Sequence, residues 1–140
     1  MIAVDTSIVF AILMQEPDAP RYIKKLEEET ELLISAGTYV ELGAVMNKKS
    51  GPKALEILDA FLEEAEIEIA PMSAKQARIA RDAYYTYSIL NFGDCFSYAL
   101  AKEKGIPLLY KGNDFAKTDI ASALCGLRSD EQVEEEDSAL

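Results

Sequence analysis

The chain opens on Ile2-Ala3-Val4-Asp5-Thr6-Ser7, a short apolar run that ends in a carboxylate and two hydroxyl residues. An uninterrupted apolar run is typical of a strand that is buried on both faces of a parallel sheet. Thr6 or Ser7 is a suitable N-cap for a helix over residues 8–14. The opening therefore predicts a strand, a polar strand end and a helix, which is the first unit of an α/β fold.

The same alternation of patterns continues along the chain. Thr38 and Glu41 have the spacing of a capping box at a helix start, as do Ser73 and Gln76, and Gly105 is a typical helix stop. Strands alternating with helices predict a single α/β domain, a three-layer α/β/α doubly wound parallel sheet. We expect further strands at 31–35, 66–70 and 107–110, and further helices at 21–29, 38–49, 53–65, 73–88 and 94–104.

Length and charge describe an acidic single-domain protein. The chain has 140 residues, 14 basic and 25 acidic, with a net charge of −11. Residues 129–140 carry acids and no base, so we expect residues 1–128 to form the domain and residues 129–140 an acidic, disordered tail. The overall acidity disfavours tight, sequence-independent binding to nucleic acid, but it does not exclude cleavage at a metal-charged site.

The composition excludes several kinds of site. The chain has no histidine, which excludes a Ser-His-Asp triad, a Cys-His pair and a His-ligated zinc site. Cys95 and Cys125 are too few for a Cys₄ site and suggest a reducing compartment; we expect Cys95 to pack as a small buried hydrophobe. No signal peptide is recognisable, and no apolar run approaches the ~20 residues of a membrane span, so we expect a cytoplasmic protein without a membrane segment.

Acidic residues follow the predicted strands. Asp5 follows the first strand, Glu41 comes soon after the second, and Asp114 follows the last, while Asp94 begins the helix that leads into the last strand. Ligands bind at the carboxyl ends of the strands in such sheets. Two unit charges 4 Å apart repel by about 4 kcal/mol at an effective dielectric constant near 20. Convergence of these four acids therefore predicts one or two divalent cations, Mg²⁺ or Mn²⁺.

Each of these acids also has a structural explanation. Asp5 and Asp94 are suited to helix N-termini, Glu41 fits the capping box, and Asp114 lies in a turn sequence. Asp119 is either a fifth acid or a helix cap, of which we favour the cap. Four residues are candidates for a supporting role: Thr6, Ser7, Asn113 and Asp119.

The second half of the chain is rich in aromatic side chains. These side chains could pack in the core, stack on bases or form a dimer interface. Of the three uses we favour core packing, because aromatic rings bury a large area. The residues in question are Tyr84, Tyr85, Tyr87, Phe92, Phe96 and Tyr98.

Four segments, in order, resemble the motifs of PIN-domain ribonucleases. They are the opening stretch, Tyr39-Val40-Glu41-Leu42, the segment 91–101 that contains Asn91-Phe92-Gly93-Asp94-Cys95, and the segment 107–120 that contains Lys111-Gly112-Asn113-Asp114. Within that superfamily, the length and the last segment look most like VapC, the toxin of type II toxin–antitoxin (VapBC) pairs.

The resemblance implies an Mg²⁺- or Mn²⁺-dependent endoribonuclease. It would hydrolyse RNA phosphodiesters by a metal-activated water, form a homodimer and be held inactive by a VapB-type antitoxin. By position, Asp5, Glu41 and Asp94 match the acidic motif residues. Many relatives carry an acid where this chain has Asn113, so Asp114 or Asp119 would supply the fourth ligand, or that ligand position would be weakened. The acidic tail is not part of the family pattern.

Other functions remain as alternatives. A catalytically degenerate PIN-like domain would act as a binding or assembly module, and it would not take up a divalent ion. An aspartate-nucleophile phosphatase would use Asp5, but that chemistry usually has a second acid two residues later, where Ser7 stands. A phospho-accepting receiver domain is disfavoured because its acidic pair after the first strand is absent.

Overall fold

The computed structural model describes residues 1–124, and a four-stranded parallel sheet lies at their centre. The strand order is β3-β2-β1-β4, and all three pairs of neighbouring strands are parallel. The strands span Ile2–Val4 (β1), Leu32–Ser35 (β2), Ile67–Ala70 (β3) and Leu108–Leu109 (β4). All four predicted strands are thus confirmed.

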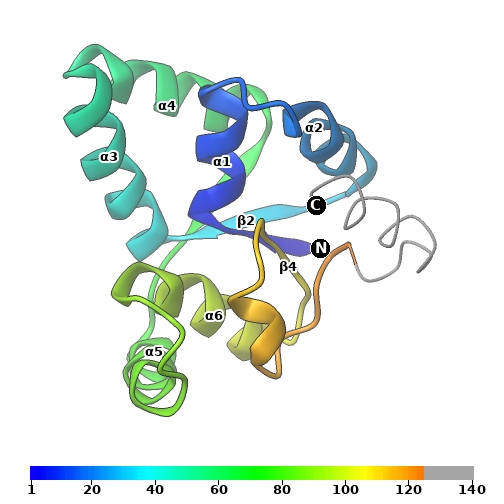
Figure 1. Cartoon of the computed structure of the whole chain (residues 1–140), viewed down its shortest axis with the longest axis vertical. Helices are drawn as coiled ribbons and strands as arrows, with labels where there is room; N and C mark the ends of the chain where they lie inside the picture. The colour runs from blue at the N-terminus through cyan, green and yellow to red at the C-terminus, as the bar shows by residue number, and fades with distance from the viewer. Residues whose placement is uncertain (125–140) are drawn as a thin grey trace.

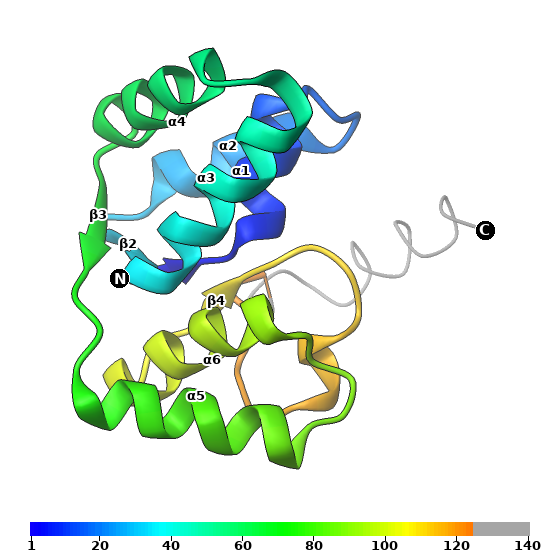
Figure 2. The same cartoon turned by 90° about the vertical axis from the view of Figure 1, so that its left-hand side faces the viewer.

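Helices cover both faces of this sheet (Figure 1). Figure 2 shows α1 to α4 stacked on one side and α5 with α6 on the other, which confirms the predicted three-layer α/β/α fold. The helices span Thr6–Leu13 (α1), Ala19–Glu28 (α2), Ala36–Ser50 (α3), Lys53–Glu64 (α4), Ala74–Thr86 (α5) and Phe92–Lys104 (α6), and a 3₁₀ turn covers Phe115–Lys117 (η1). No helix among residues 1–124 is long and apolar enough to cross a bilayer.

β1 and β4 are apolar throughout because both of their faces are buried. Side chains alternate in direction along a strand. In β1, Ile2 and Val4 join the core beneath α1 to α4, whereas Ala3 joins the core beneath α5 and α6. In β4, Leu109 and Leu108 divide between the two cores in the same way. This burial on both faces explains why Ile2–Val4 is apolar without interruption.

The order of the strands fixes where a ligand can approach. The chain runs outward from β1 through β2 to β3 and then returns past β1 to add β4 at the opposite edge. The direction of winding therefore reverses between β1 and β4, and open α/β sheets bind ligands at the carboxyl ends of strands at such a point. Asp5 is the first residue after β1, so it lies at this position.

Four helices, α1, α2, α3 and α6, begin two residues earlier than predicted, and at α1 and α3 the capping residue differs from the predicted one. Asp5 is the N-cap of α1 and accepts a hydrogen bond from the backbone N–H of Ser7, so the predicted start by Thr6 or Ser7 was wrong. Ser35 is the N-cap of α3, and its hydroxyl accepts from the N–H of Gly37. Thr38 consequently lies inside the helix, and the predicted capping box of Thr38 and Glu41 was wrong.

At the start of α5 and at the end of α6 the sequence signals are closer to the structure. Ser73 caps α5 as predicted, and its hydroxyl accepts from the backbone N–H of Gln76. The side-chain amide of Gln76 donates to Glu103, so it does not complete a capping box. Gly105 ends α6 with a positive φ of 64°, which glycine adopts without strain. Cys125, the predicted boundary at residue 128 and the predicted tail 129–140 lie outside the described residues.

Candidate active site

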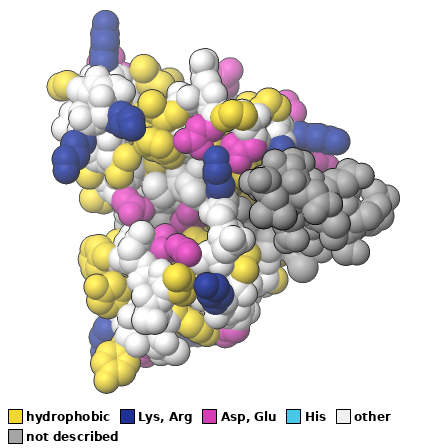
Figure 3. All heavy atoms as spheres, viewed as in Figure 1, with side chains coloured by type: hydrophobic (Ala, Val, Ile, Leu, Met, Phe, Trp, Pro, Cys, Tyr) yellow, Lys and Arg dark blue, Asp and Glu magenta, His cyan; other side chains and the backbone are white. Residues whose placement is uncertain are grey.

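Acidic side chains from three elements meet at the carboxyl end of β1. Asp5 ends that strand, Glu41 comes from the second turn of α3, and Asp94 from the first turn of α6. The charges of Asp5, Glu41 and Asp114 each raise the pKa of Asp94, so all four predicted acids lie close enough to interact electrostatically. Figure 3 shows acidic side chains gathered near the middle of one face, between the α1–α4 side and the α5–α6 side.

Asp5 is buried, and hydrogen bonds hold both of its carboxylate oxygens. Ser97 of α6 donates its hydroxyl to Oδ1 at 2.5 Å. Ser7 donates its hydroxyl to Oδ2 at 2.7 Å and its backbone N–H to the same oxygen at 3.1 Å. The Ser7 hydroxyl oxygen in turn accepts from the backbone N–H of Lys111, just after β4. Asp5 is therefore both the cap of α1 and a carboxylate of fixed orientation.

Glu41 reaches the site because Gly93 leaves room for it. The hydroxyl of Thr6 donates a hydrogen bond to the carboxylate of Glu41. A Cβ atom added at Gly93 would overlap the Glu41 carboxylate. The glycine thus permits α6 to approach α3 closely at the point where the two helices carry their acids.

Asp94 combines a structural role with its place in the cluster. Asn91 caps α6 by accepting from the N–H of Asp94 at 2.9 Å, and Asp94 accepts from the N–H of Asn91 at 3.0 Å. This reciprocal pair is a capping box, which the sequence reading had not assigned here. Both interpretations of Asp94, as a helix-terminus residue and as a member of the acidic cluster, apply together.

The pKa shifts report the cost of bringing these acids together. Burial raises the pKa of Asp94 to about 6, and repulsion from Asp5, Glu41 and Asp114 adds to this rise, while the hydrogen bond to Asn91 opposes it. Burial and the charge of Asp5 likewise raise the pKa of Glu41, against the hydrogen bond from Thr6. A nearby cation would relieve both effects, because it favours the ionised form of each carboxylate.

Asp114 and its neighbour Asn113 stand at the edge of the site. Both side chains are exposed. Asp114 occupies the N-cap position of η1 without making a side-chain capping bond, so its carboxylate is available to a ligand in this part of the structure.

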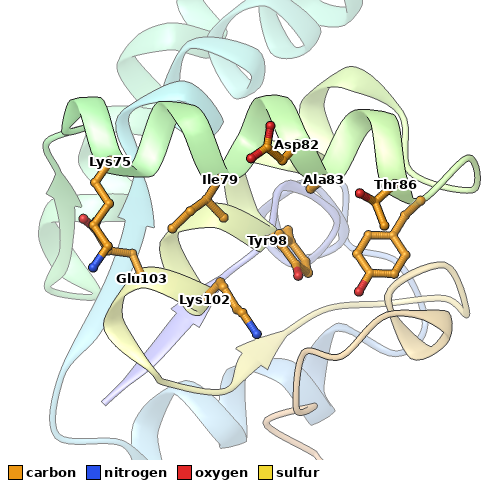
Figure 4. Close-up of a pocket in the computed structure, with 9 residues that line it drawn as sticks. Lys75, Ile79, Asp82, Ala83, Thr86, Tyr98, Lys102 and Glu103 are labelled. Atoms are coloured by element: carbon orange, nitrogen blue, oxygen red, sulfur yellow. The ribbon is translucent and has the colours of Figure 1, made fainter.

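Asp119 is bound elsewhere. Its carboxylate accepts hydrogen bonds from the Tyr98 hydroxyl and the Lys102 ammonium, both at 2.6 Å. Lys102 lowers the pKa of Asp119, and Tyr98 contributes to the same effect. Tyr98 and Lys102 line a pocket of about 400 Å³ between α5 and α6 (Figure 4). The predictions of Asp119 as a helix cap or as an alternative fourth ligand find no support in these contacts.

The donor chemistry of the cluster fits a hard divalent cation. Every candidate ligand atom is a carboxylate or hydroxyl oxygen, which is what Mg²⁺ and Mn²⁺ prefer. Among residues 1–124, however, no three acidic or cysteine side chains are already placed as metal ligands are. Glu41 and Asp94 make the hydrogen bonds described above instead. The catalytic and metal-ligating roles of these residues therefore stay predictions.

The aromatic residues divide between core and surface. Tyr98 is buried, and Tyr87 and Phe96 are partly buried against the same core. Tyr84, Tyr85 and Phe92 are 56%, 93% and 69% exposed, and we call these three side chains the aromatic surface. Figure 3 shows hydrophobic side chains gathered at the lower left, over the α5 region. Core packing is thus confirmed for only part of the set. The free thiol of Cys95 is buried as predicted.

Sequence reasoning missed three contributors to the site. Ser97 binds Asp5, Thr38 binds Ser97 at 3.2 Å, and Gly93 makes room for Glu41. A usable signal existed, because Thr38 lies three residues before Glu41 and Ser97 three residues after Asp94. Each hydroxyl thus sits one helical turn from an acid and on the same side of its helix.

Comparison with known proteins identifies the family and the fold. The PIN domain family matches residues 2–121. Ribonuclease VapC28 of Mycobacterium tuberculosis is 43% identical over 128 residues, covering 86% of this chain and 96% of that protein. The fold matches that of M. tuberculosis VapC20, a sarcin-ricin loop cleaving toxin, with a TM-score of 0.73 at 17% identity, covering 86% of this chain and 97% of that one. It also matches VapBC2 from Rickettsia felis bound to a promoter DNA fragment, with a TM-score of 0.70 at 21% identity, covering 87% and 96%. This chain belongs to the VapC ribonuclease family of PIN-domain proteins.

Proposed function

We propose that this chain is an Mg²⁺- or Mn²⁺-dependent endoribonuclease that acts as the toxin of a toxin–antitoxin pair. The convergence of Asp5, Glu41 and Asp94 at the reversal point of the sheet is the observation that carries the proposal. Relatives that are named ribonucleases, at 39% to 43% identity over most of the chain, support the choice of RNA as the substrate.

The proposed division of labour follows from the contacts of each acid. Asp5 and Asp94 would be the principal ligands of the cation, because they come from the strand end and the helix terminus that frame the site. Glu41 would bind the cation directly or through water, or act as a general base. Asp114 would complete the site from the loop after β4. When bound, the cation supplies Lewis-acid stabilisation of the phosphodiester and a water of lowered pKa.

The protein's own residues keep these acids in place. The Ser7 and Ser97 hydroxyls orient Asp5, and the Thr6 hydroxyl holds Glu41 on the side of α3 that faces α6. Positioned groups of this kind need no reorganisation when charge develops during the reaction.

The partner that we propose is a VapB-type antitoxin with a basic segment. The net charge of −11 and the acidic cluster favour a cationic peptide, and an arginine could pair bidentately with the carboxylates. Among the solved structures with the same fold, one is titled a toxin–antitoxin complex from Klebsiella pneumoniae. A reducing cytoplasm is the proposed location.

We also propose a homodimer, and the aromatic surface is its best-suited contact. Exposed aromatic side chains are enriched at protein interfaces relative to the rest of a protein surface. Tyr84 and Phe92 also contact each other edge-on, with ring centroids 6.3 Å apart, so part of this surface is preorganised.

Cleavage of a mixed transfer-RNA pool tests the activity. The purified protein should cut RNA with Mg²⁺ or Mn²⁺, should stop on addition of EDTA, and should be inactive as Asp94→Asn. Asp119→Asn is the matched control, because that acid binds Tyr98 and Lys102, and it should retain activity. Equal trace activity in wild type and Asp94→Asn, or none with either metal, would instead favour the degenerate binding module.

A further inference from the structure

A chain of buried hydroxyl groups runs from α3 through α6 to Asp5. Thr38 Oγ1 and Ser97 Oγ are 3.2 Å apart, and Ser97 Oγ is 2.5 Å from Asp5 Oδ1. Thr38 is 0% and Ser97 1% exposed, so neither hydroxyl has water as an alternative partner. A buried polar group costs free energy unless it is hydrogen-bonded, which makes the arrangement of these two hydroxyls specific.

The direction of the two hydrogen bonds follows from the number of protons. An ionised carboxylate only accepts hydrogen bonds, and a serine hydroxyl has a single proton to donate. Ser97 must therefore donate to Asp5, which leaves Thr38 to donate to Ser97. A hydroxyl that accepts one hydrogen bond becomes a stronger donor of the next, so Thr38 strengthens the bond from Ser97 to Asp5.

The donors around Asp5 leave one direction open. A carboxylate offers about four lone-pair sites, two on each oxygen. On Oδ2, the hydroxyl and the N–H of Ser7 occupy both sites. On Oδ1, Ser97 occupies one site. The remaining site on Oδ1 is the one that a cation can use.

The chain also links the elements that carry the other acids. Thr38 lies one turn before Glu41 on α3, and Ser97 lies one turn after Asp94 on α6. Their hydrogen bond therefore pins the two helices together beneath the acids, at a point where the absence of a side chain at Gly93 lets them approach.

We propose that Ser97 is a positioning residue of the cation site, which, backed by Thr38, orients Asp5 so that Oδ1 faces the cation shared with Glu41 and Asp94. This inference rests on the proposed metal-dependent function. If Ser97 only satisfied hydrogen bonds in the core, its removal would leave cation affinity unchanged. If Ser97 orients Asp5, its removal weakens cation binding.

Manganese binding, followed by electron paramagnetic resonance of the full-length protein, tests the proposal. Ser97→Ala should weaken Mn²⁺ binding about tenfold or more, the range found when a group that orients a metal ligand is removed. Thr38→Val, which keeps the shape and removes the hydroxyl, should weaken binding less. Thr38→Ser, which keeps the hydroxyl, should restore an affinity close to that of the wild type.

A second buried hydroxyl provides the control. Ser35→Ala removes a fully buried hydroxyl that caps α3 and is not one of the hydrogen-bond donors to the Asp5 carboxylate. It should lower the melting temperature without weakening Mn²⁺ binding. Wild-type Mn²⁺ affinity in a folded Ser97→Ala protein would overturn the positioning role and leave the proposed function standing. Failure of the wild-type protein to bind Mn²⁺ would overturn both.

Discussion

The ionised carboxylate of Asp94 lowers the stability of the fold. Its pKa of about 6 lies above the ordinary value of 3.8, so below pH 6 the folded state binds a proton more readily than the unfolded state. Stability contributed by this group is therefore present at low pH and is lost as the pH rises from about 4 to about 6. Removing the charge should recover that loss.

In EDTA, Asp94→Asn should melt at a higher temperature than the wild type at pH 7.5, because it removes a half-buried charge that Glu41 and Asp5 repel. Below pH 4 the gain should vanish, since the wild-type carboxyl is then protonated. Thermal unfolding of both proteins across this pH range measures the difference. A variant that is less stable than the wild type at pH 7.5 would show that the capping hydrogen bond to Asn91 outweighs the repulsion.

Gly93 provides a second test at the scale of one residue. Gly93→Ala should abolish RNA cleavage, because its Cβ would displace the Glu41 carboxylate. Gly43→Ala is the matched control on α3, since its Cβ would only contact Leu55 at an ordinary 3.6 Å. The Gly43→Ala protein should remain active, and its free energy of unfolding should rise by about 1 kcal/mol because alanine has the higher helix propensity. Full activity of Gly93→Ala would mean that Glu41 does not need its present position.

At the scale of elements, the limits of sequence reasoning lie at the helix starts. The elements themselves are predictable, since apolar runs and helical periodicity report burial directly. The residue that caps each helix is less predictable, because Asp5, Thr6 and Ser7 are all good caps by composition. Only the folded geometry selects Asp5, whose other oxygen is held by Ser97, 92 residues away. Contacts between distant segments leave no local signal.

The candidate site was predictable to a similar degree. Placement after strands pointed to Asp5 and, less directly, to Glu41, since parallel strands end at a common edge. Asp94 begins a helix instead, and the resemblance to the family motif was needed to select it. Placement after strands did not separate Asp114 from Asp119, because both follow β4 within a few residues. That choice depends on Tyr98 and Lys102, which approach Asp119 from α6.

The N-terminus of α6 couples stability to the site. Asn91→Ala should lower the free energy of unfolding by about 1 kcal/mol, the usual cost of losing an N-cap side chain. It should also reduce cleavage, because the backbone N–H of Asp94 loses the Asn91 side-chain oxygen that fixes the first turn of α6. Ser73→Ala removes the cap of α5, whose hydroxyl binds Glu103 and none of the four clustered acids, and it should cost similar stability while leaving activity intact. Denaturant unfolding and RNA cleavage measure the two effects. Equal activity of both variants would contradict the coupling.

For the whole molecule, the aromatic surface should decide the assembly state. Tyr85→Ser should shift the protein from dimer to monomer, because it removes an aromatic ring from the proposed contact. The ring is 93% exposed, so its loss should change the stability of the isolated monomer little. Ile57→Ser, on the exposed face of α4, is the control and should leave the dimer intact. Sedimentation velocity distinguishes the two. A dimer that persists in Tyr85→Ser would place the contact elsewhere, and a monomeric wild type would contradict the homodimer.

The sheet, α3 and α6 bring Asp5, Glu41 and Asp94 together, and we propose that these carboxylates bind a divalent cation. Isothermal titration of the protein with Mn²⁺ is the decisive experiment, with Asp5→Asn, Glu41→Gln, Asp94→Asn and Asp119→Asn in parallel. We predict saturable binding by the wild type and by Asp119→Asn, and severely weakened binding by the other three. Wild-type binding that survives in Asp5→Asn and Asp94→Asn, or no binding by the wild type at all, would contradict it.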